Sequence, residues 1–491
     1  MRTLTVIVAL ALGTLHSTHV AAQSQPLGRS LATLVSEAEA RHPLPGATVA
    51  YRFVDANTGR VLAESGADTP LNPASNTKLL TAAAALSLLG PSYRFETTVH
   101  GLRSAADPSA IAGDLVLYSN GDPDLRTGHL FELARALSND GIRRVDGALV
   151  LDESAFGDEH LPPAFEQQPD EQAPFRAAVG SLSIDENTSV VHIFAPTAGA
   201  PLSVLAEPRG YIELVSTATA AAPGTASTLA TLFAPLPDGR EQLRLSGAVA
   251  ASPTPVLLRR RLANPAQAVG AVWRATLEAA GITVSGPVTV VSSASARPMP
   301  PLAAHRSAPL SSLLLAVGKE SNNFTAEMTL LALAGDAPPA TAAATRSRFA
   351  RASERVLGWA RGRGVDTRAM VYRNGSGLFD ANRFSATQVT ALLRTMWRDP
   401  SLRHEYLAQL AANGDEGTLR HRLGAPTPVR LVRAKTGTLD DVVALSGYLL
   451  TADPNRAVIF SYLANGVRGQ TTAARQRIDA LVGSWMARRL Q

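Results

Sequence analysis

Apolar and polar positions along the front of the chain follow first a strand pattern and then a helix pattern. Residues 45–68 alternate with a period of two and are interrupted by "DANTG", which predicts a β-hairpin that turns around residues 57–59. The Ala/Leu-rich stretch that follows predicts a helix, capped by Asn72 or Ser75, that ends near Gly90. The front of the chain therefore predicts a hairpin followed by one helix.

The pattern changes twice further along the chain. From about residue 95 to 299, short strand-like runs alternate with stretches rich in Ala, Pro, Gly, Ser and Thr. Within this region residues 264–281 predict an amphipathic helix, and 217–239 predict loop or irregular sheet. After it, helices are predicted at 309–335, 340–364 and 386–398, adjacent antiparallel strands at 429–450 and 457–466, and an amphipathic helix at the end.

The two ends of the chain therefore predict one α+β domain, an antiparallel sheet flanked by helices that takes strands from both ends. We expect this domain to comprise residues 23–95 and 300–491. Residues 96–299 then form a large β-rich insertion of one or two extra domains. Their subdivision stays open from the sequence.

The first 22 residues resemble an export signal. Arg2 is followed by an apolar run over 3–15, and the small residues at 20–22 precede Gln23. The run is short for a transmembrane helix, so we expect no stable membrane span and a periplasmic location, with an uncleaved anchor as the alternative. The chain has no cysteine, which excludes disulfides and thiol catalysis. Its net charge of +5 is thinly spread, so we expect no nucleic-acid partner.

The basic residues of the chain are almost all arginine. Of 46 Lys and Arg residues, only Lys78, Lys319 and Lys435 are lysines. Lysine differs from arginine because it loses its proton at accessible pH when it is buried or lies beside another cation. The three lysines are therefore candidates for catalytic or binding residues. The alternative is that they occur by chance in an arginine-rich composition. For Lys319 we favour a charge on a helix surface over a role in tuning the local field.

Ser75 and Lys78 are three residues apart, which places them on one face of the predicted helix. A serine hydroxyl is a weak nucleophile that needs a base beside it, and lysine can be that base once its pKa falls. On its own, this spacing favours a helix cap beside a solvated lysine.

Two further motifs follow downstream. Ser321 and Asn323 lie between two helical segments, where a loop can direct both side chains into one cleft; a polar helix start is the alternative. Lys435 and Thr436 lie on a predicted strand, and Gly437 indicates close backbone approach by a ligand; an exposed edge strand is the alternative. Together the motifs occur in the order S-x-x-K, S-x-N and K-T-G, which favours serine acylation.

These three motifs resemble those of the penicillin-recognising serine enzymes. About half the chain separates Ser75 from Ser321, which is similar to the class C low-molecular-mass penicillin-binding proteins of the penicillin-binding protein 4 type. Asn374 is a departure, because the family usually has Asp before "GSGL", and it puts only a local turn or surface contact in doubt. Further stretches that resemble the family are "NPASNTKLLTAAAAL", "YSNGDPDL", "HRSAPLSSLLLAVGKESNNFTAE", "NGSGL" and "GDEGTLRHRL".

The resemblance implies a transpeptidase-like catalytic domain and D-alanyl-D-alanine carboxypeptidase or DD-endopeptidase activity on peptidoglycan stem peptides. It implies β-lactam antibiotics as covalent inhibitors. The histidines show no metal-binding spacing and the chain has no P-loop or dinucleotide fingerprint, so we expect no metal or other cofactor. The alternatives are a β-lactamase-like serine hydrolase and a non-catalytic penicillin-binding wall module. The balance of carboxypeptidase and endopeptidase, the preferred stem peptide and the oligomeric state stay open.

The resemblance also implies roles for the first two motifs. Ser75 would be acylated by the penultimate D-Ala carbonyl, with Lys78 as its general base. Ser321 and Asn323 would pass the proton on and orient the substrate amide.

For the third motif, the resemblance implies that Lys435 and Thr436 bind the terminal carboxylate of the substrate. The backbone N–H of Thr438, with that of the nucleophile, would form the oxyanion hole, and Gly437 would leave room for the substrate along the strand. Asp152 would contact the basic end of the stem peptide, although a turn residue at a strand end is an equal alternative.

Overall fold

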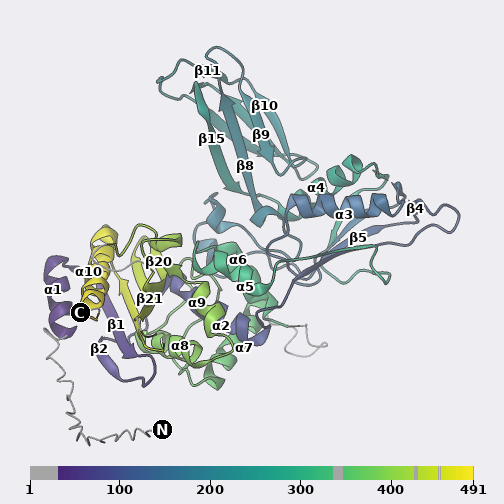
Figure 1. The fold of residues 1–491 in the computed structure, drawn as a ribbon. Helices are drawn as coiled ribbons and strands as arrows, with labels where there is room; N and C mark the ends of the chain where they lie inside the picture. The colour runs from purple at the N-terminus through teal and green to yellow at the C-terminus, as the bar shows by residue number, and fades with distance from the viewer. Residues whose placement is uncertain (1–30, 336–346, 425–429, 452, 454, 490–491) are drawn as a thin grey trace, which may run out of the picture.

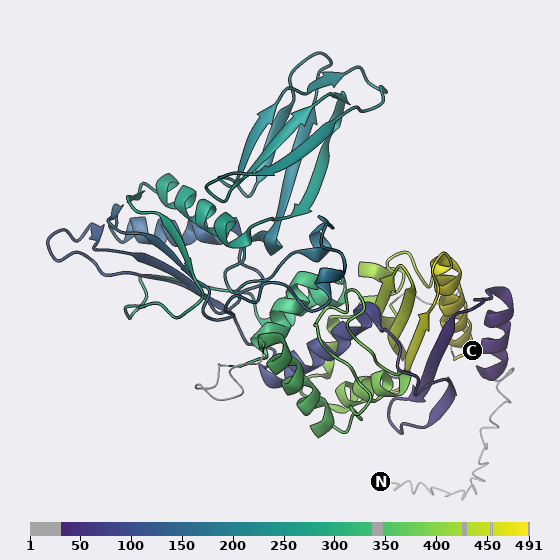
Figure 2. The ribbon, with the colours of Figure 1, turned by 180° about the vertical axis from the view of Figure 1, so that it is seen from behind.

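The computed structural model describes residues 31–335, 347–424, 430–451, 453 and 455–489, so the expected export signal at 1–22 lies outside the described residues. Figures 1 and 2 show three units: a layered helix–sheet–helix body that contains both ends of the described chain, and two smaller units that branch from it.

The first unit is built on a six-stranded antiparallel sheet. Its strands follow the spatial order β19 (Ala411–Ala412), β20 (Val432–Leu439), β21 (Val442–Leu450), β22 (Ala457–Asn465), β1 (Thr48–Asp55) and β2 (Val61–Ser65). The β1–β2 hairpin is confirmed, and β1 pairs with β22 along its whole length, so strands from both ends of the chain are neighbours. The single strand predicted at 429–450 is instead two strands, β20 and β21, which pair with each other.

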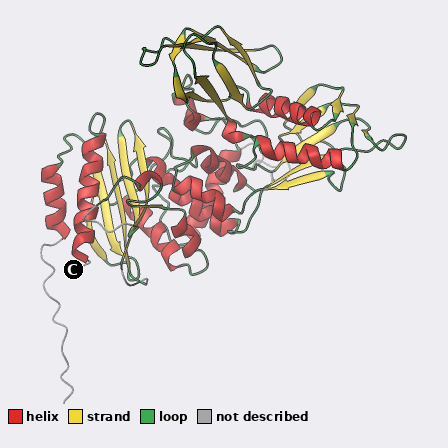
Figure 3. Cartoon of the chain, turned by 45° about the horizontal axis from the view of Figure 1, so that its top comes forward, coloured by secondary structure: helices red, strands yellow, loops and turns green. Residues whose placement is uncertain are grey.

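Helices cover both faces of this sheet (Figure 3). On one face lie α1 (Leu31–Arg41), which the sequence pattern did not predict, and α10 (Thr471–Arg489). The other face is covered by α2 (Lys78–Leu88), α5 (Leu310–Gly318), α6 (Asn323–Ala332), α7 (Arg348–Gly362), α8 (Ala386–Arg398) and α9 (Arg403–Ala408). Helix α2 is apolar nearly all round and buried from Lys78 to Leu86, as expected for a helix inside a core. Its first residue is therefore a lysine that the fold places out of water.

The second unit is a mixed sheet with two helices packed on it. Its strand order is β17 (Val288–Val291), β7 (Leu149–Asp152), β5 (Leu115–Ser119), β3 (Glu96–His100) and β18 (Ala303–Arg306). Helices α3 (Thr127–Asn139) and α4 (Pro265–Ala279) pack on this sheet, beside a small sheet of β16 (Thr283–Val284), β6 (Arg144–Val145) and β4 (Ala110–Ile111). Because β18 pairs with β3, the sheet extends past residue 299, where we expected the insertion to end.

The third unit consists of facing β-sheets. One sheet has the order β10 (Ile212–Ser216), β13 (Glu241–Ser246) and β12 (Ala230–Pro235), and another has β15 (Ser252–Arg261), β8 (Thr188–Ala195) and β9 (Ser203–Glu207). Strands β11 (Thr219–Ala221) and β14 (Ala248–Ala250) form a separate pair. Apolar side chains from β8 and β13 meet in the core between the sheets. The region 217–239 is thus partly regular sheet.

The chain between β7 and β8 returns to the first unit before it enters the third. It forms three short 3-10 turns, η2 (Phe165–Gln167), η3 (Pro174–Arg176) and η4 (Asp185–Asn187). Turn η3 packs against α6, and Phe165 stacks edge-on against Phe379 of the first unit. This segment therefore forms one wall of the site described next.

Candidate active site

Ser75 lies in a 3-10 turn, η1 (Ala74–Thr77), that runs directly into α2. The turn begins at Ala74 with φ of +47°, and the Asn72 Oδ1 atom accepts a hydrogen bond from the Ala74 N–H at 2.9 Å. The predicted cap is therefore wrong: neither Asn72 nor Ser75 caps α2, because the α-helix begins at Lys78 and its N-cap, Thr77, makes no side-chain cap bond. Ser75 stands one helical turn ahead of Lys78.

The Lys78 amine makes three close contacts at the start of α2. Its Nζ atom lies 3.0 Å from Ser75 Oγ, 2.7 Å from Asn323 Oδ1 and 2.8 Å from the carbonyl oxygen of Ser376. A neutral amine has two N–H donors and one lone pair. If it donates to Asn323 and Ser376, its lone pair is left for the hydroxyl proton of Ser75.

The surroundings of Lys78 disfavour its charged form. The residue is 1% exposed, and burial lowers its pKa well below the ordinary value of lysine. The positive charge of Lys435 lowers the pKa further, whereas the carboxylate of Glu327 opposes both effects. The arrangement therefore supplies what a lysine base requires, an amine that loses its proton far below pH 10.5.

The second motif lies in the loop between α5 and α6. Ser321 has φ of +62°, a strained value for a non-glycine residue, and Asn323 is the first residue of α6. The intervening Asn322 caps α6 by accepting the Thr325 N–H at 2.9 Å. Asn323 contacts Lys78 with its oxygen and donates from Nδ2 to the carbonyl of Phe175 in η3 at 3.0 Å. It therefore connects the base to the inserted part of the chain.

The third motif lies on β20, beside the nucleophile turn. Lys435 is fully buried, its Nζ donates to the carbonyl of Thr436 at 2.9 Å, and burial lowers its pKa to about 7. The Thr436 hydroxyl donates to Thr418 Oγ1 at 2.9 Å. A Cβ atom on Gly437 would lie 2.9 Å from the carbonyl oxygen of Pro73. The close approach that we predicted at Gly437 is therefore made by the chain itself, since the glycine lets the nucleophile turn pack on the strand.

An open cavity of about 690 Å³ lies at this junction. Ser75, Ser321, Asn323 and Thr438 all line it, so the first two motifs meet the residue that follows K-T-G in one cleft, whereas Lys435, Thr436 and Gly437 are not among its lining residues. Phe175 of η3 lines the same cleft, which therefore has walls from both the first unit and the insertion.

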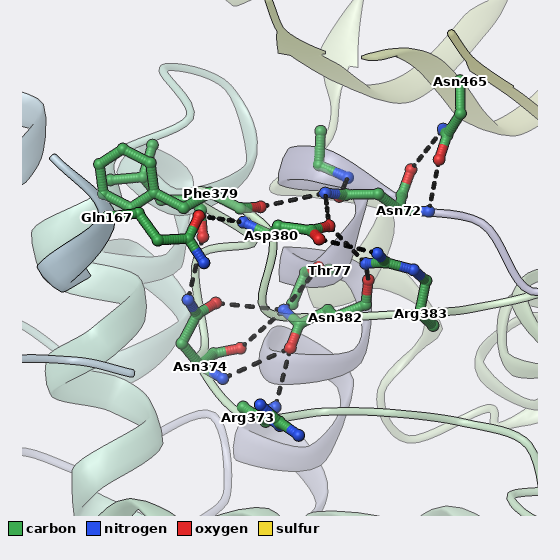
Figure 4. A network of polar contacts seen from close by, with 12 residues as sticks. Asn72, Thr77, Gln167, Arg373, Asn374, Phe379, Asp380, Asn382, Arg383 and Asn465 are labelled. Atoms are coloured by element: carbon green, nitrogen blue, oxygen red, sulfur yellow. Dashed lines mark hydrogen bonds and ion pairs between the residues drawn. The ribbon is translucent and has the colours of Figure 1, made fainter. Parts of the chain in front are cut away.

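Asn72 fixes the nucleophile turn to two other elements (Figure 4). Its Nδ2 donates to the Phe379 carbonyl at 3.0 Å and to Asp380 Oδ1 at 3.1 Å. Its backbone N–H and carbonyl exchange hydrogen bonds of 2.8 and 3.0 Å with the side-chain amide of Asn465 on β22. The segment before Ser75 is thus held to the sheet and to the loop that carries Phe379.

Asn374 and Asn382 form a fully buried pair within that loop (Figure 4). Asn382 Nδ2 donates to Thr77 Oγ1 at 3.1 Å and also to Asn374 Oδ1. Asn374 accepts the Gly377 N–H at 2.9 Å and donates to the Pro163 carbonyl at 2.9 Å. Asn374, the departure from the family pattern, therefore organises a buried turn and makes no surface contact.

Asp152 lies away from the cleft, at the end of β7. Its carboxylate is fully buried, accepts the Ser154 N–H at 2.9 Å and the Ser295 hydroxyl at 2.7 Å, and lies 3.8 Å from Arg297. Its oxygens are turned inward to hold the segment after β17, and its contact with a substrate stays a prediction. The alternative, a turn residue at a strand end, describes it.

Lys319 is a partly exposed charge at the end of α5, and it is held in an ion pair. Its Nζ lies 2.9 Å from Glu416 Oε2, and Glu416 is also bound by Arg433 at 2.8 Å. The Lys319 carbonyl accepts the Thr418 N–H at 3.0 Å. This ion-pair cluster fixes the loop that carries Thr418, the hydroxyl partner of Thr436.

Sequence reasoning did not identify Ser376 and Glu327 as parts of the site. Ser376 acts through its main-chain carbonyl, which no side-chain motif reports, although it lies in the quoted "NGSGL" stretch. Glu327 is 1% exposed, and its position four residues after Asn323 was the available signal.

Within the described ranges, the structure shows neither a cluster of metal ligands nor a membrane-spanning helix. No group of three or more His, Asp or Glu side chains there could hold a metal ion. None of the helices there combines the length and the apolar character that a bilayer span requires.

Comparisons with known proteins relate nearly all of the described chain to one family. Residues 31–488 match the model of the D-Ala-D-Ala carboxypeptidase 3 (S13) family. The chain is 33% identical over 446 residues to a D-alanyl-D-alanine carboxypeptidase from Actinomadura sp., covering 88% of this chain and 80% of that relative. It is 24% identical over 423 residues to D-alanyl-D-alanine carboxypeptidase DacB from Haemophilus influenzae, covering 86% of each.

Solved structures support the fold. The crystal structure of penicillin binding protein 4 (dacB) from Haemophilus influenzae matches with a TM-score of 0.75 and 23% identity, over 92% of this chain and 98% of that chain. A predatory peptidoglycan endopeptidase from Bdellovibrio bacteriovorus matches with a TM-score of 0.52 and 16% identity, over 90% and 92% of the two chains. The α+β fold class predicted from the sequence is confirmed, as is the family resemblance. With a family match that spans nearly all of the described residues, this chain belongs to the D-Ala-D-Ala carboxypeptidase 3 (S13) family.

Proposed function

We propose that this chain is a penicillin-sensitive serine DD-peptidase that acts on peptidoglycan stem peptides through an acyl-enzyme on Ser75. The observation that carries the proposal is the buried Lys78 amine, 3.0 Å from Ser75 Oγ and held by Asn323 and Ser376. Family membership supports D-Ala-D-Ala as the substrate class.

In the acylation step, neutral Lys78 takes the hydroxyl proton of Ser75 while Oγ bonds to the carbonyl carbon of the penultimate D-Ala. The π electrons move onto oxygen, where the backbone N–H groups of Ser75 and Thr438 stabilise the charge. The C–N bond then breaks, and the Ser321 hydroxyl passes the proton from Lys78 to the leaving amine. Asn323 orients both the substrate amide and Lys78.

Deacylation completes the cycle with water as the second reactant. Water bonds to the ester carbon, and one of its protons returns to Oγ of Ser75 as the ester bond breaks. The products are the regenerated serine and a shortened stem peptide whose new carboxylic acid releases the second water proton to solvent.

Lys435 and Thr436 bind the terminal carboxylate in this proposal. A buried cation without an anion beside it is disfavoured, which is why burial brings the pKa of Lys435 down to about 7. A substrate carboxylate would supply the missing negative charge. Gly437 keeps the strand close to the nucleophile turn, so the carboxylate site and Ser75 stay in register.

Cleavage of terminal D-Ala and cleavage of D-Ala cross-links use the same acyl-enzyme, so the chain performs one or both. A β-lactamase-like hydrolase would share the acylation step and differ in rapid release of the opened antibiotic. A non-catalytic wall module would bind penicillin without turning over a peptide.

We further propose a periplasmic location after export by residues 1–22. The catalytic domain comprises residues 23–95 and 300–491 in this proposal, and 96–299 are inserted. The β3–β18 pairing supports moving the second boundary to residue 306.

Labelling with a fluorescent penicillin tests the acyl-enzyme. Wild type and Ser401→Ala, an exposed serine next to α9, should be labelled equally, and Ser75→Ala should not be labelled. An unlabelled wild type, or an equally labelled Ser75→Ala variant, would overturn the proposal. Release of the label within seconds would favour a β-lactamase.

Purified cross-linked muropeptides then test the peptidase activity. Free D-Ala reports carboxypeptidase action, and conversion of dimers to monomers reports endopeptidase action. A labelled protein that releases neither product is a wall-binding module.

A further inference from the structure

Glu327 is a buried carboxylate beside the active site that the mechanism above does not use. It is 1% exposed and lies on α6, four residues after Asn323. Residues four apart share one face of a helix, so α6 directs the amide of Asn323 and the carboxylate of Glu327 towards the same side. An ionisable group this deeply buried requires specific partners, because burial of a charge without them costs several kcal/mol.

The carboxylate has two backbone partners in the loop that lies over Lys78. Glu327 Oε2 accepts the Gly375 N–H and Oε1 accepts the Ser376 N–H, both at 2.8 Å. The carbonyl groups of the same two residues bond to α2: Gly375 O accepts the Thr81 hydroxyl at 2.7 Å, and Ser376 O accepts from Lys78 Nζ at 2.8 Å. The segment is therefore clamped between α6 and α2.

Helix α6 determines two of the three contacts of the Lys78 amine, one directly and one through this clamp. Asn323 reaches Nζ directly from α6, and the Ser376 carbonyl reaches it through a segment whose N–H groups Glu327 holds. Only the third contact, to Ser75, comes from the nucleophile turn.

Glu327 is also the carboxylate that faces Lys78: burial raises its pKa, whereas the hydrogen bonds from Ser376 and Gly375 and the charge of Lys78 favour its anionic form. The other titratable groups that act on the pair of Lys78 and Glu327 are Lys435 on β20 and the Tyr372 phenol on the loop before Gly375. Burial and Lys435 lower the pKa of Lys78, and Glu327 raises it. When Lys78 takes the serine proton, two ammonium groups lie close together in a buried site, and Glu327 is the anion that offsets them.

We propose that Glu327 is a positioning residue, which orients Lys78 through the Gly375–Ser376 segment and stabilises the ammonium form that arises during acylation. The inference rests on the proposed role of Lys78 as the base. We therefore expect that removing the charge of Glu327 and shortening its side chain change the rate of acylation and its pH dependence differently.

The test measures the rate of acylation by a fluorescent penicillin against pH in two variants. Glu327→Gln removes the charge and places an amide opposite one N–H. We expect its rate at the plateau to fall about 10- to 100-fold. Its acid limb should move to lower pH by about one unit, because an ammonium that has lost its anion gives up its proton more easily. Glu327→Asp keeps the charge, so its acid limb should stay at the wild-type pH while the rate falls less.

Glu241→Gln is the matched control. Glu241 is a 4% exposed glutamate on β13 of the third unit, paired with Arg260 at 3.4 Å, and its variant should keep the wild-type profile. Circular dichroism and thermal unfolding establish that each variant is folded.

The inference is overturned if Glu327→Gln keeps the wild-type rate and acid limb. It is also overturned if Glu327→Gln and Glu327→Asp are both unfolded, because Glu327 would then be required for folding alone. The proposed function fails in a different way, namely if the wild type is not labelled at Ser75.

Discussion

Asn322 Nδ2 donates a 2.7 Å hydrogen bond to Glu186 Oε2, and this contact joins the insertion to the loop between Ser321 and Asn323. Glu186 lies in η4 with φ of +58°, and its other carboxylate oxygen is bound by Arg126 of the second unit at 3.1 Å. A non-glycine residue holds such a backbone conformation only when its surroundings impose it. The second unit therefore braces the active-site loop.

Replacing Glu186 by Ala should loosen that loop. We expect acylation by a fluorescent penicillin to slow about 3- to 10-fold, because Ser321 and Asn323 lose one fixed neighbour. Glu186→Gln keeps an acceptor for Asn322 and should lose less. Glu278→Ala, at an exposed position of α4, is the control and should match wild type. Equal rates for Glu186→Ala and Glu278→Ala would show that the contact between Asn322 and Glu186 does not affect acylation.

Lys435→Met should move the acid limb of acylation to higher pH. The cation of Lys435 lowers the pKa of Lys78, so its removal makes the Lys78 ammonium easier to keep. The neutral base then forms only at higher pH, which is the opposite of the shift expected for Glu327→Gln. The acylation rate at saturating penicillin reports the change in the pKa of Lys78. The loss of Lys435 as a partner of the ligand carboxylate appears instead in the penicillin concentration that gives half the maximal rate. A limb that stays in place would exclude electrostatic coupling between the lysines.

Asp122→Asn should stabilise the protein at pH 8 and not at pH 4. Asp122 is fully buried with Oδ2 3.6 Å from His305 Nε2, and burial raises the pKa of Asp122 to about 6. Since the folded state holds a proton that the unfolded state releases near pH 4, stability is lost as pH rises from 4 to 6. Ionisation of Asp122 lowers the free energy of unfolding at pH 8 by about 2–3 kcal/mol, at ~1.4 kcal/mol per pKa unit, and a neutral Asn avoids this loss. Urea unfolding at the two pH values measures it, and an equal effect at both would contradict the assignment.

Motifs and periodicity predicted much of the fold and much of the site. Hairpin β1–β2, helices α4 and α8 and strand β22 follow local patterns, and local patterns are readable in one sequence. The three motifs also led to Ser75, Lys78 and Asn323, which meet in the structure.

The missed features depend on contacts between distant segments. Ser376 contributes a carbonyl oxygen and Asp152 turns inward towards a loop more than 140 residues later, and neither fact has a local signature. Gly437 was predicted to admit a ligand because a strand glycine indicates close approach without saying by what. The cap predicted at Asn72 or Ser75 was misplaced because a 3-10 turn held by Asn72 stands between these residues and the start of α2 at Lys78.

Gly437→Ala should slow acylation strongly while leaving the protein folded. The added Cβ would lie 2.9 Å from the Pro73 carbonyl and 3.1 Å from Ala74 Cβ, so the nucleophile turn must move off the strand. A displacement of even a fraction of an ångström misplaces Ser75 against Lys78, and we expect the acylation rate to fall at least about 100-fold.

Gly358→Ala is the control that separates this clash from a general effect of the substitution. Gly358 lies inside α7, with nothing within 4 Å of its added Cβ, so alanine should stabilise the helix by about 0.5–1 kcal/mol. Its acylation rate should equal that of wild type. Thermal unfolding measures the stability of both variants, and penicillin labelling measures their acylation rates. A Gly437→Ala protein that labels at the wild-type rate would mean that the turn carrying Ser75 can shift without disturbing the serine–lysine pair.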